Sequence, residues 1–409
     1  MKPLRRKFIR RVSLCAIAAC AATVVACSSA GSQGSAPANS GGTGASTAAA
    51  NGSGKVIKLG LLTSLTGPVA SSFGQTTADA AQAAVKLANA SHTLPGVQLQ
   101  LIVADDQSSP AGALSALKYL VQQQHVPVLG AGFDPGWANP QYTNLFAIWG
   151  SASADYPDFK NLGTYFKQQG GTSLCAIGDQ SPSSIGGVQE LAASVKREGL
   201  ATPYVNVSLQ VSTTDFSAVA LAIKSSGCDV VGGQLTGAQD VSLIEAINNV
   251  GVKMKASYFA GGYAQSLLQD PAVRAAVQGY GFGVQFEPSS LNTAATKAMQ
   301  SALAKYANYS EPNPAVGTPW GWFPAQLAVE GFKVAGVNAS QSQYIAKLRQ
   351  VSSFDYGGLT CPVDFSKFGY VPSITNTGCT WIAVPKGEQF VSATGESPIM
   401  LTVVPGTKN

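Results

Sequence analysis

Charged residues and histidines are scarce in this sequence of 409 residues. Asp, Glu, Lys and Arg together make up 11% of the chain, and the histidines are His92 and His125 alone. The 7 cysteines include no Cys-x-x-Cys pair. Zinc sites need Cys or His ligands at short, regular spacing, so we expect no metal site and no cofactor. Histidine-dependent catalysis has equally few candidates.

Sequence signatures of common enzymes are also missing. There is no Gly-x-Ser-x-Gly elbow, and residues 52–56 (Gly-Ser-Gly-Lys-Val) lack the spacing and the Ser or Thr of a phosphate-binding loop. Asp105 and Asp106 are adjacent carboxylates at a predicted strand end. Neighbouring strand residues point to opposite faces, which does not suit a catalytic dyad. We expect no catalytic residues and no enzyme activity.

The beginning of the chain lacks acids, and the segment behind it lacks charge altogether. Residues 1–11 contain six basic residues and no acidic one, residues 12–26 are apolar or small, and residues 28–54 carry no charge. The run Val24-Val25-Ala26-Cys27 resembles a bacterial lipobox. This order predicts a signal peptide over 1–26, lipidation of Cys27, and a flexible linker over 27–54.

Alternatives remain open for this segment. Its apolar stretch of about 15 residues is shorter than the roughly 20 that a membrane-spanning helix needs, which favours a lipoprotein over a transmembrane anchor. A second lipobox-like run ends at Cys20, but the polar residues directly after Cys27 favour Cys27. Residues 5–10 also resemble a twin-arginine signal, so the export route stays open.

Little net charge remains beyond this segment. Residues 1–26 hold six of the 26 basic residues and none of the 21 acidic ones, which leaves the rest of the chain near −1. A nucleic-acid partner would require a basic surface, so we expect none. No later segment is long and apolar enough to cross a membrane, and the length of 55–409 suggests two domains.

The cysteines beyond the N-terminal segment predict two disulfides. Four remain if Cys27 is acylated, and an even number in an exported chain is typical of disulfides. Cys175 and Cys228 each lie near the start of a predicted strand, and Cys361 and Cys379 flank a short Gly-, Pro- and Ser-rich segment. Of the three possible pairings we expect Cys175–Cys228 and Cys361–Cys379.

Predicted strands and helices alternate along the folded part. This alternation predicts an α/β fold with doubly wound parallel sheets, and the restart of the pattern near residue 173 predicts a second lobe. The tail from Tyr356 is expected to be β. The expected strands cover 56–62, 98–104, 173–178, 204–209, 229–233 and 256–260, and the expected helices cover 75–90, 109–124, 184–198, 215–225, 239–250, 292–307 and 323–336.

Several short motifs, in their order along the chain, carry a family resemblance. They are residues 61–67 with Phe73-Gly74, residues 105–110, residues 214–217 and residues 357–359. With them the chain resembles type I periplasmic solute-binding proteins of the leucine/isoleucine/valine-binding family, which serve ABC importers. The resemblance implies two α/β lobes joined by three crossover segments, with the solute in the cleft between them.

The resemblance also sets the expected domain boundaries. Residues 55–160 with 286–345 should form lobe 1, and residues 165–282 with 346–409 should form lobe 2. Members of the family usually have a further strand, loop and helix before a strand like 126–130, whereas here residues 122–125 lead directly into it. Lobe 1 is therefore expected to be one βα unit short.

Candidate binding residues lie in the loops that follow the predicted strands, because ligands of open α/β sheets bind at the carboxyl ends of strands. Each candidate has a structural alternative, since hydroxyls and Asp179 can cap helices or turns and aromatic rings can pack in the core. Trp320 and Trp322 are expected to pack between helices. The candidates are Thr63, Ser64, Thr66, Phe133 and Trp137 in lobe 1 and Asp179, Gln234, Thr236 and Tyr263 in lobe 2.

The expected function is capture of a small polar solute by a monomeric protein anchored by lipid to the outer face of the cell membrane. ABC permease subunits are the expected partners. An amino acid as the solute follows from the resemblance alone, because the loop 260–265 carries no acid to hold an ammonium group. The alternative is a two-lobed lipoprotein with a sensory or partner-binding role, in which ligand binding is altered or lost.

Overall fold

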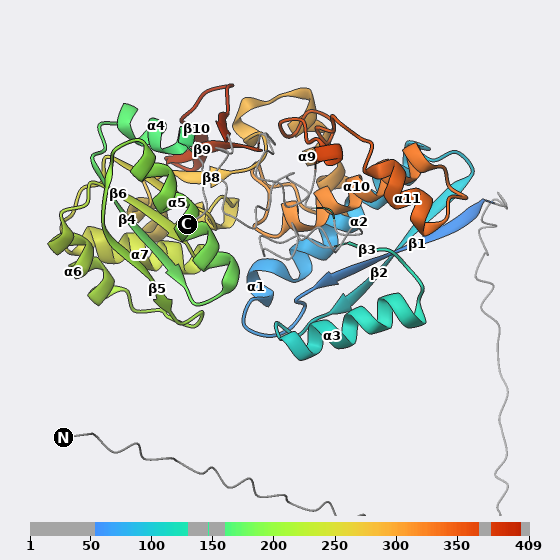
Figure 1. Cartoon of the computed structure of the whole chain (residues 1–409), viewed down its shortest axis with the longest axis horizontal. Coiled ribbons are helices and arrows are strands. Elements are labelled where there is room, and N and C mark those ends of the chain that lie inside the picture. Colours follow the sequence, from blue (N-terminus) through green and yellow to red (C-terminus); the bar gives the residue numbers. More distant parts are fainter. Residues whose placement is uncertain (1–53, 130–145, 147–159, 368–377, 402–409) are drawn as a thin grey trace, which may run out of the picture. The chain divides into compact units, whose positions relative to one another are not determined.

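The computed structural model describes residues 54–129, 146, 160–367 and 378–401. These residues form two separate β-sheets with helices packed on them (Figure 1). The predicted signal peptide, Cys27, Phe133 and Trp137 lie outside the described residues.

The first sheet is small and parallel. It has three strands in the order β2-β1-β3, and β1 pairs with β2 along its whole length, from Lys55 opposite Val97 to Thr63 opposite Asp105. Because the strands are parallel, their carboxyl ends meet at one edge. The elements are β1 (Lys55–Thr63), α1 (Ala70–Phe73), α2 (Gln75–Ala90), β2 (Val97–Asp105), α3 (Pro110–Lys118), the π-helix η1 (Tyr119–Gln123) and β3 (Val128–Leu129).

Helix α2 shows why the alanine-rich run folds as it does. Alanine has the highest helix propensity, and its small side chain lets a neighbouring helix approach closely. Helix α10 (Thr318–Ala335) uses this at Gly321, where a Cβ atom would lie 2.0 Å from the carbonyl oxygen of Thr77. Figure 1 shows α9 (Ala294–Ala307) and α10 beside α2, and α11 (Gln341–Leu348) follows them.

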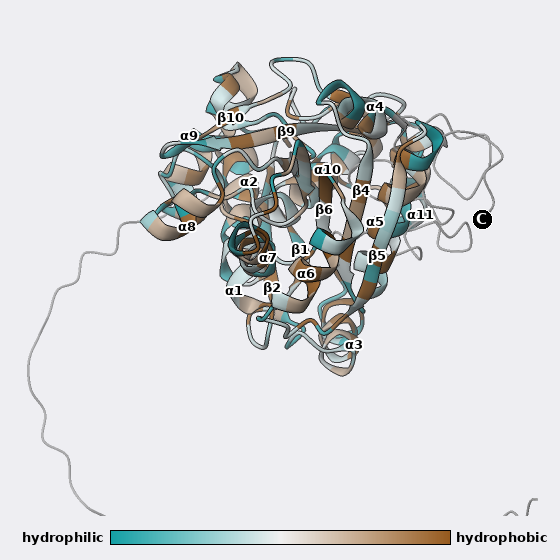
Figure 2. Cartoon of the chain, turned by 90° about the vertical axis from the view of Figure 1, so that its left-hand side faces the viewer, coloured by the Kyte–Doolittle hydropathy of each residue, from teal (hydrophilic) through white to brown (hydrophobic). Residues whose placement is uncertain are grey.

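The second sheet is larger and mixed. Its five parallel strands run in the order β5-β4-β6-β7-β8, and β9 then pairs antiparallel with β8, β10 and β11. Every residue of β4 after Ser173 is buried, as expected for a central parallel strand, and Figure 2 shows the hydrophobic residues along β4 and β6. The strands are β4 (Ser173–Asp179), β5 (Ala201–Leu209), β6 (Val230–Gln234), β7 (Ala256–Phe259), β8 (Phe282–Val284), β9 (Gly378–Lys386), β10 (Gln389–Ser392) and β11 (Ile399–Leu401).

Helices α5, α6 and α7 connect the parallel strands of this sheet. A proline in the first turn starts α5, and a capping box of Thr236 and Gln239 starts α7. The helices of this part are α4 (Lys160–Gln168), α5 (Pro182–Arg197), α6 (Ser217–Ser226), α7 (Gly237–Asn249) and α8 (Pro271–Ala276), and short 3-10 helices occur at Gln265–Leu268, Ser289–Leu291 and Phe365–Lys367.

The predicted α/β fold class is confirmed, and so are both disulfides. Cys175–Cys228 and Cys361–Cys379 have Cα–Cα distances of 5.7 Å and 6.0 Å. The first joins Cys175 in β4 to Cys228, which lies two residues before the neighbouring strand β6. The shorter helices α4, α8 and α11 were not predicted from the sequence.

The chain passes between the two sheets after β8. From β8 it continues into α9 and α10, which pack on α2 of the first sheet, and it returns as β9 beside β8. The lobe boundaries stay a prediction. Only four residues, 124–127, separate η1 from β3. The absence of one βα unit from lobe 1 stays a prediction, because it also concerns residues outside the described part.

In the part of the chain that the structure describes, none of the helices combines the length and the apolar character that crossing a membrane requires.

Candidate solute-binding site

A cavity of about 610 Å³ opens where the strands of both sheets end. Its wall includes Ser64 after β1, Asp106 after β2, Asp179 at the end of β4, and Gln234 at the end of β6. The loops after parallel strands are where open α/β sheets bind ligands. The cavity is large enough for a small organic molecule.

On the side of the first sheet, two hydroxyls face the cavity but bond to the protein itself. The Thr63 hydroxyl donates to the carbonyl oxygen of Phe73 at 2.5 Å, and the Ser64 hydroxyl donates to Asp106 Oδ1 at 2.6 Å. The same Oδ1 accepts the backbone N–H of Ser108 at 2.8 Å. These bonds tie the loops after β1 and β2 together.

Thr66 is placed differently from its neighbours. Its side chain is exposed and is not among the residues that line the cavity. Its hydroxyl donates to Asp105 Oδ2 at 2.7 Å, and this bond is the largest of the contacts that lower the pKa of Asp105. Thr66 and Asp105 therefore stabilise the loop in this structure, and the two adjacent carboxylates have separate partners.

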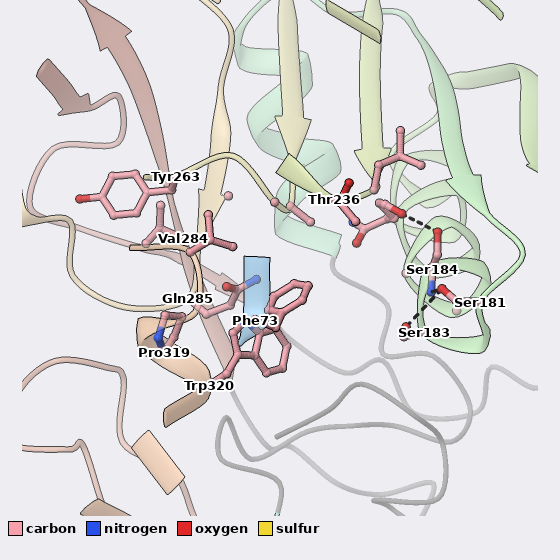
Figure 3. A pocket seen from close by; sticks show the side chains of 18 of the residues that line it. Phe73, Ser181, Ser183, Ser184, Thr236, Tyr263, Val284, Gln285, Pro319 and Trp320 are labelled. Carbon is pink, nitrogen blue, oxygen red and sulfur yellow. Dashed lines mark hydrogen bonds between the residues drawn. The ribbon is translucent and has the colours of Figure 1, made fainter. Parts of the chain in front are cut away.

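On the side of the second sheet, the N-terminus of α5 forms a polar wall. The Ser184 hydroxyl donates to the carbonyl oxygen of Gln234 at 2.5 Å and accepts the backbone N–H of Asp179 at 2.8 Å. Asp179 is buried, and its Oδ1 accepts the backbone N–H of Ser181 at 2.8 Å. Figure 3 shows Ser181, Ser183 and Ser184 together at this end of the helix.

Thr236 lines the cavity at the start of α7 and also caps that helix. Its hydroxyl accepts the backbone N–H of Gln239. Behind it, Asp240 is fully buried: Oδ2 accepts the backbone N–H of Gly261, while Oδ1 has no hydrogen-bond partner. Burial raises the pKa of Asp240 well above its ordinary value, so this carboxyl is neutral over a wider pH range than usual.

Tyr263 contributes its ring to the wall rather than its hydroxyl. The hydroxyl donates to Asn313 Oδ1 at 3.0 Å and accepts the backbone N–H of Ser289 at 2.9 Å. Burial raises the pKa of Tyr263 to about 12. In Figure 3 the hydroxyl of Tyr263 points away from Gln285 and Trp320.

An aromatic pair that the sequence analysis did not propose forms another part of the wall. The rings of Phe73 and Trp320 meet edge to face, with centroids 5.8 Å apart, and both are only partly buried. Gln285 lies beside them (Figure 3). Trp322 packs in the core as expected, with 1% of its surface exposed. The motif around Phe73-Gly74 was the one sequence signal for this wall.

A carboxyl and a phenol lie at another part of the wall. Burial raises the pKa of Glu190, on α5, well above its ordinary value. Burial is also the main reason that the pKa of Tyr258 is raised to about 12; the Glu190 charge adds to the rise, and hydrogen bonds with Thr380 and Gln285 oppose it. Strand β7 and helix α5 thus bring Tyr258 within electrostatic range of Glu190.

The structure brings six of the nine predicted binding residues to the cavity. Thr66 lies outside the lining, and Phe133 and Trp137 lie outside the described residues. Within the described ranges, no group of His, Cys, Asp or Glu side chains is arranged to bind a metal ion. The predicted residues that line the cavity are Thr63, Ser64, Asp179, Gln234, Thr236 and Tyr263.

Solved structures of ABC transporter proteins share this fold at low sequence identity. A branched-chain amino acid ABC transporter protein from Thermus thermophilus with bound valine is 16% identical, with a TM-score of 0.69 over 84% of this chain and 96% of the other. A solute-binding protein from R. palustris in complex with benzoate is 17% identical, with a TM-score of 0.66 over 86% and 98%. A fatty acid ABC transporter substrate-binding protein from Thermomonospora curvata is 18% identical, with a TM-score of 0.65 over 86% and 93%.

Sequence comparison identifies the family. A comparison with curated proteins finds no match. The sequence model described as "Periplasmic binding protein" matches residues 56–139 and 120–369, which together span most of the folded part. Membership implies a location outside the cytoplasm and a binding role rather than catalysis. The chain belongs to the periplasmic binding protein family.

Proposed function

We propose that this chain is an extracytoplasmic, lipid-anchored protein that binds a small solute reversibly for an ABC importer. The observation that carries the proposal is the cavity of about 610 Å³ at the strand ends of both sheets. It combines apolar and aromatic surface with a few hydroxyl, amide and carboxyl groups, which is the usual composition of a site for a small molecule.

The solute should contact groups from both sheets. Phe73 and Trp320 offer ring faces, and Gln285 and the N-terminal serines of α5 offer hydrogen bonds. Closure of the two lobes around a hinge would then replace the water around the solute with fixed protein contacts. A permease could recognise the arrangement of the two lobes in the closed form. The solved relatives hold valine or benzoate, which supports a solute of modest size.

The sensory or partner-binding alternative, with ligand binding lost, predicts a filled or collapsed cleft. The open cavity and its partly exposed aromatic pair favour solute capture instead.

A thermal-shift screen followed by calorimetry tests solute binding. Amino acids, amides, amines, small carboxylates and aromatic compounds are offered to the protein without its signal peptide, and a solute that binds the folded state raises Tm by mass action. Trp320→Ala should weaken binding of any hit. Tyr119→Ala, which truncates an exposed aromatic residue outside the cavity lining, should leave binding unchanged. Absence of binding across the whole panel would contradict the proposal.

The lipid anchor is tested separately. Mass spectrometry of protein from its native membrane should find a diacylated N-terminal Cys27. Cys27→Ser should release the protein from the membrane, whereas Cys20→Ser should not. If Cys20→Ser alone releases the protein from the membrane, the lipidated residue is Cys20 and not Cys27.

A further inference from the structure

The described side chains that line the cavity and can carry a charge near neutral pH are all acidic. Within the described residues the lining includes Asp106, Asp179 and Glu190, and it includes no Lys, Arg or His. The internal segments that the structure does not describe, 130–145, 147–159 and 368–377, contain none of these basic residues in their sequence. A solute carboxylate would therefore find no cationic side chain in this wall and would be repelled by the acids.

Two of the three acids already accept hydrogen bonds from groups of the protein. Asp106 accepts the Ser64 hydroxyl and a backbone N–H, and Asp179 accepts the backbone N–H of Ser181. Glu190 differs from both, because no described residue donates a hydrogen bond to its carboxyl or pairs with its charge. Partly buried carboxyls are normally paired, so an unpaired one in a cavity wall marks a place for a ligand group.

The helix that carries Glu190 presents it to the cavity. Ser183, Gly187 and Glu190 are spaced by four and three residues, so they share one face of α5, and all three line the cavity. Gly187 makes room for the side chain of Gln234, because a Cβ at this position would lie 2.8 Å from it. Because Glu190 lines the cavity, a group of a solute in the cavity can reach its carboxyl.

The groups around Glu190 suit a charged head group next to apolar surface. Leu162 and Leu191 line the same cavity, and the phenol of Tyr258 lies within electrostatic range of the carboxyl. Burial raises the pKa of Glu190, and among the described residues no hydrogen-bond donor or positive charge compensates its ionised form. A cation would supply that compensation, since opposite charges attract strongly where water is scarce.

We propose that Glu190 binds a positively charged nitrogen of the solute, and that the solute class is an amine with an apolar or aromatic body lying against Phe73 and Trp320. This inference rests on the proposed function, because it concerns the same cavity.

The proposal predicts pH dependence of a known sign. An amine with an ordinary pKa stays protonated up to about pH 9, while Glu190 loses its proton only as the pH rises through its raised pKa. Affinity should therefore rise with pH through that range and then level off. Binding below it should release a proton from Glu190.

Matched ligands and one matched variant test the proposal by calorimetry. Apolar bodies such as butyl, isobutyl, cyclohexyl and benzyl are each offered as the amine, the primary amide, the alcohol and the carboxylate. We expect at least one amine to bind about tenfold or more tighter than its amide and carboxylate, the range that a charge-assisted hydrogen bond provides. Glu190→Gln should remove that preference and the proton release. Glu198→Gln, the same change at the end of the same helix outside the lining, should keep both.

The outcomes separate this inference from the proposed function. If carboxylates or amides bind as tightly as amines, or if Glu190→Gln keeps the preference for amines, the assignment of Glu190 is overturned while solute binding stands. If no member of any series binds, both are overturned. Retained binding of a neutral member by Glu190→Gln shows that this variant is folded.

Discussion

Replacing each disulfide by a pair of alanines should separate stability from binding in this protein. Cys175–Cys228 lies in the second sheet with both residues buried, and neither lines the cavity. Cys361 and Cys379 both line it. The first bridge therefore concerns the fold of this sheet, and the second also shapes the site.

The sizes of the two effects on stability follow from the loops that the bridges close. The sequence separations are 53 and 18 residues. In the chain-entropy treatment, loops of these lengths correspond to about 4 and about 3 kcal/mol of lost stability when the bridge is removed. Loss of packing at the fully buried Cys175 adds to the larger value, so the order of the two variants should be robust.

Urea unfolding measures the free energies, and calorimetry with a solute identified by the screen measures binding. We expect Cys175→Ala/Cys228→Ala to lose more stability and to keep the affinity of the folded protein. Cys361→Ala/Cys379→Ala should lose less stability but bind more weakly, because part of the wall is released. The reverse order of stability, or weaker binding in the first variant alone, would refute this reasoning.

Further predictions concern single residues. Because the pKa of Asp240 is raised in the folded protein, the unfolding free energy should fall by about 1.4 kcal/mol per pH unit as the pH rises from the ordinary carboxyl range towards that raised pKa. Asp240→Asn should remove this fall. Equal pH profiles of the two proteins in urea unfolding would contradict the prediction. Ser64→Ala should weaken solute binding in calorimetry, because Asp106 in the cavity wall loses a hydrogen-bond donor. Thr66→Ala should leave affinity within about twofold, because Thr66 does not line the cavity. Equal effects of the two variants would contradict the placing of Ser64 inside the cavity wall and Thr66 outside it. Gly283→Ala should destabilise the protein by about 1–3 kcal/mol in urea, because its Cβ would lie 2.3 Å from the ring of Tyr258; an unchanged midpoint would show that the ring moves freely.

Part of the site was predictable because strand ends are visible in a sequence. Apolar runs that stop at Thr63, Asp179 and Gln234 mark the carboxyl ends of strands, and parallel sheets gather such ends at one edge. All three residues line the cavity. The hydrogen-bond partners of such residues were not predictable. The sequence therefore did not show that the Thr66 hydroxyl bonds to Asp105 and does not face the cavity.

Glu190 and Trp320 show where reasoning from sequence stops. Both lie inside helices, where side chains face solvent, core or cavity according to how the helix is packed. Nothing in the local pattern tells these environments apart, because the decision depends on elements far away in the chain. Trp320 meets Phe73, 247 positions earlier, only because α10 packs on α2.

The sequence by itself determined the alternation of strands and helices, the α/β class and the number of disulfides that the four cysteines beyond Cys27 can form. These follow from local hydrophobic periodicity and from counting, which need no knowledge of distant contacts. The tertiary structure decided which hydroxyls line the cavity, which aromatic rings form its wall, and which carboxyl stands without a partner among the described residues. Those properties arise from packing between distant segments, since burial and pairing of a side chain depend on everything that surrounds it.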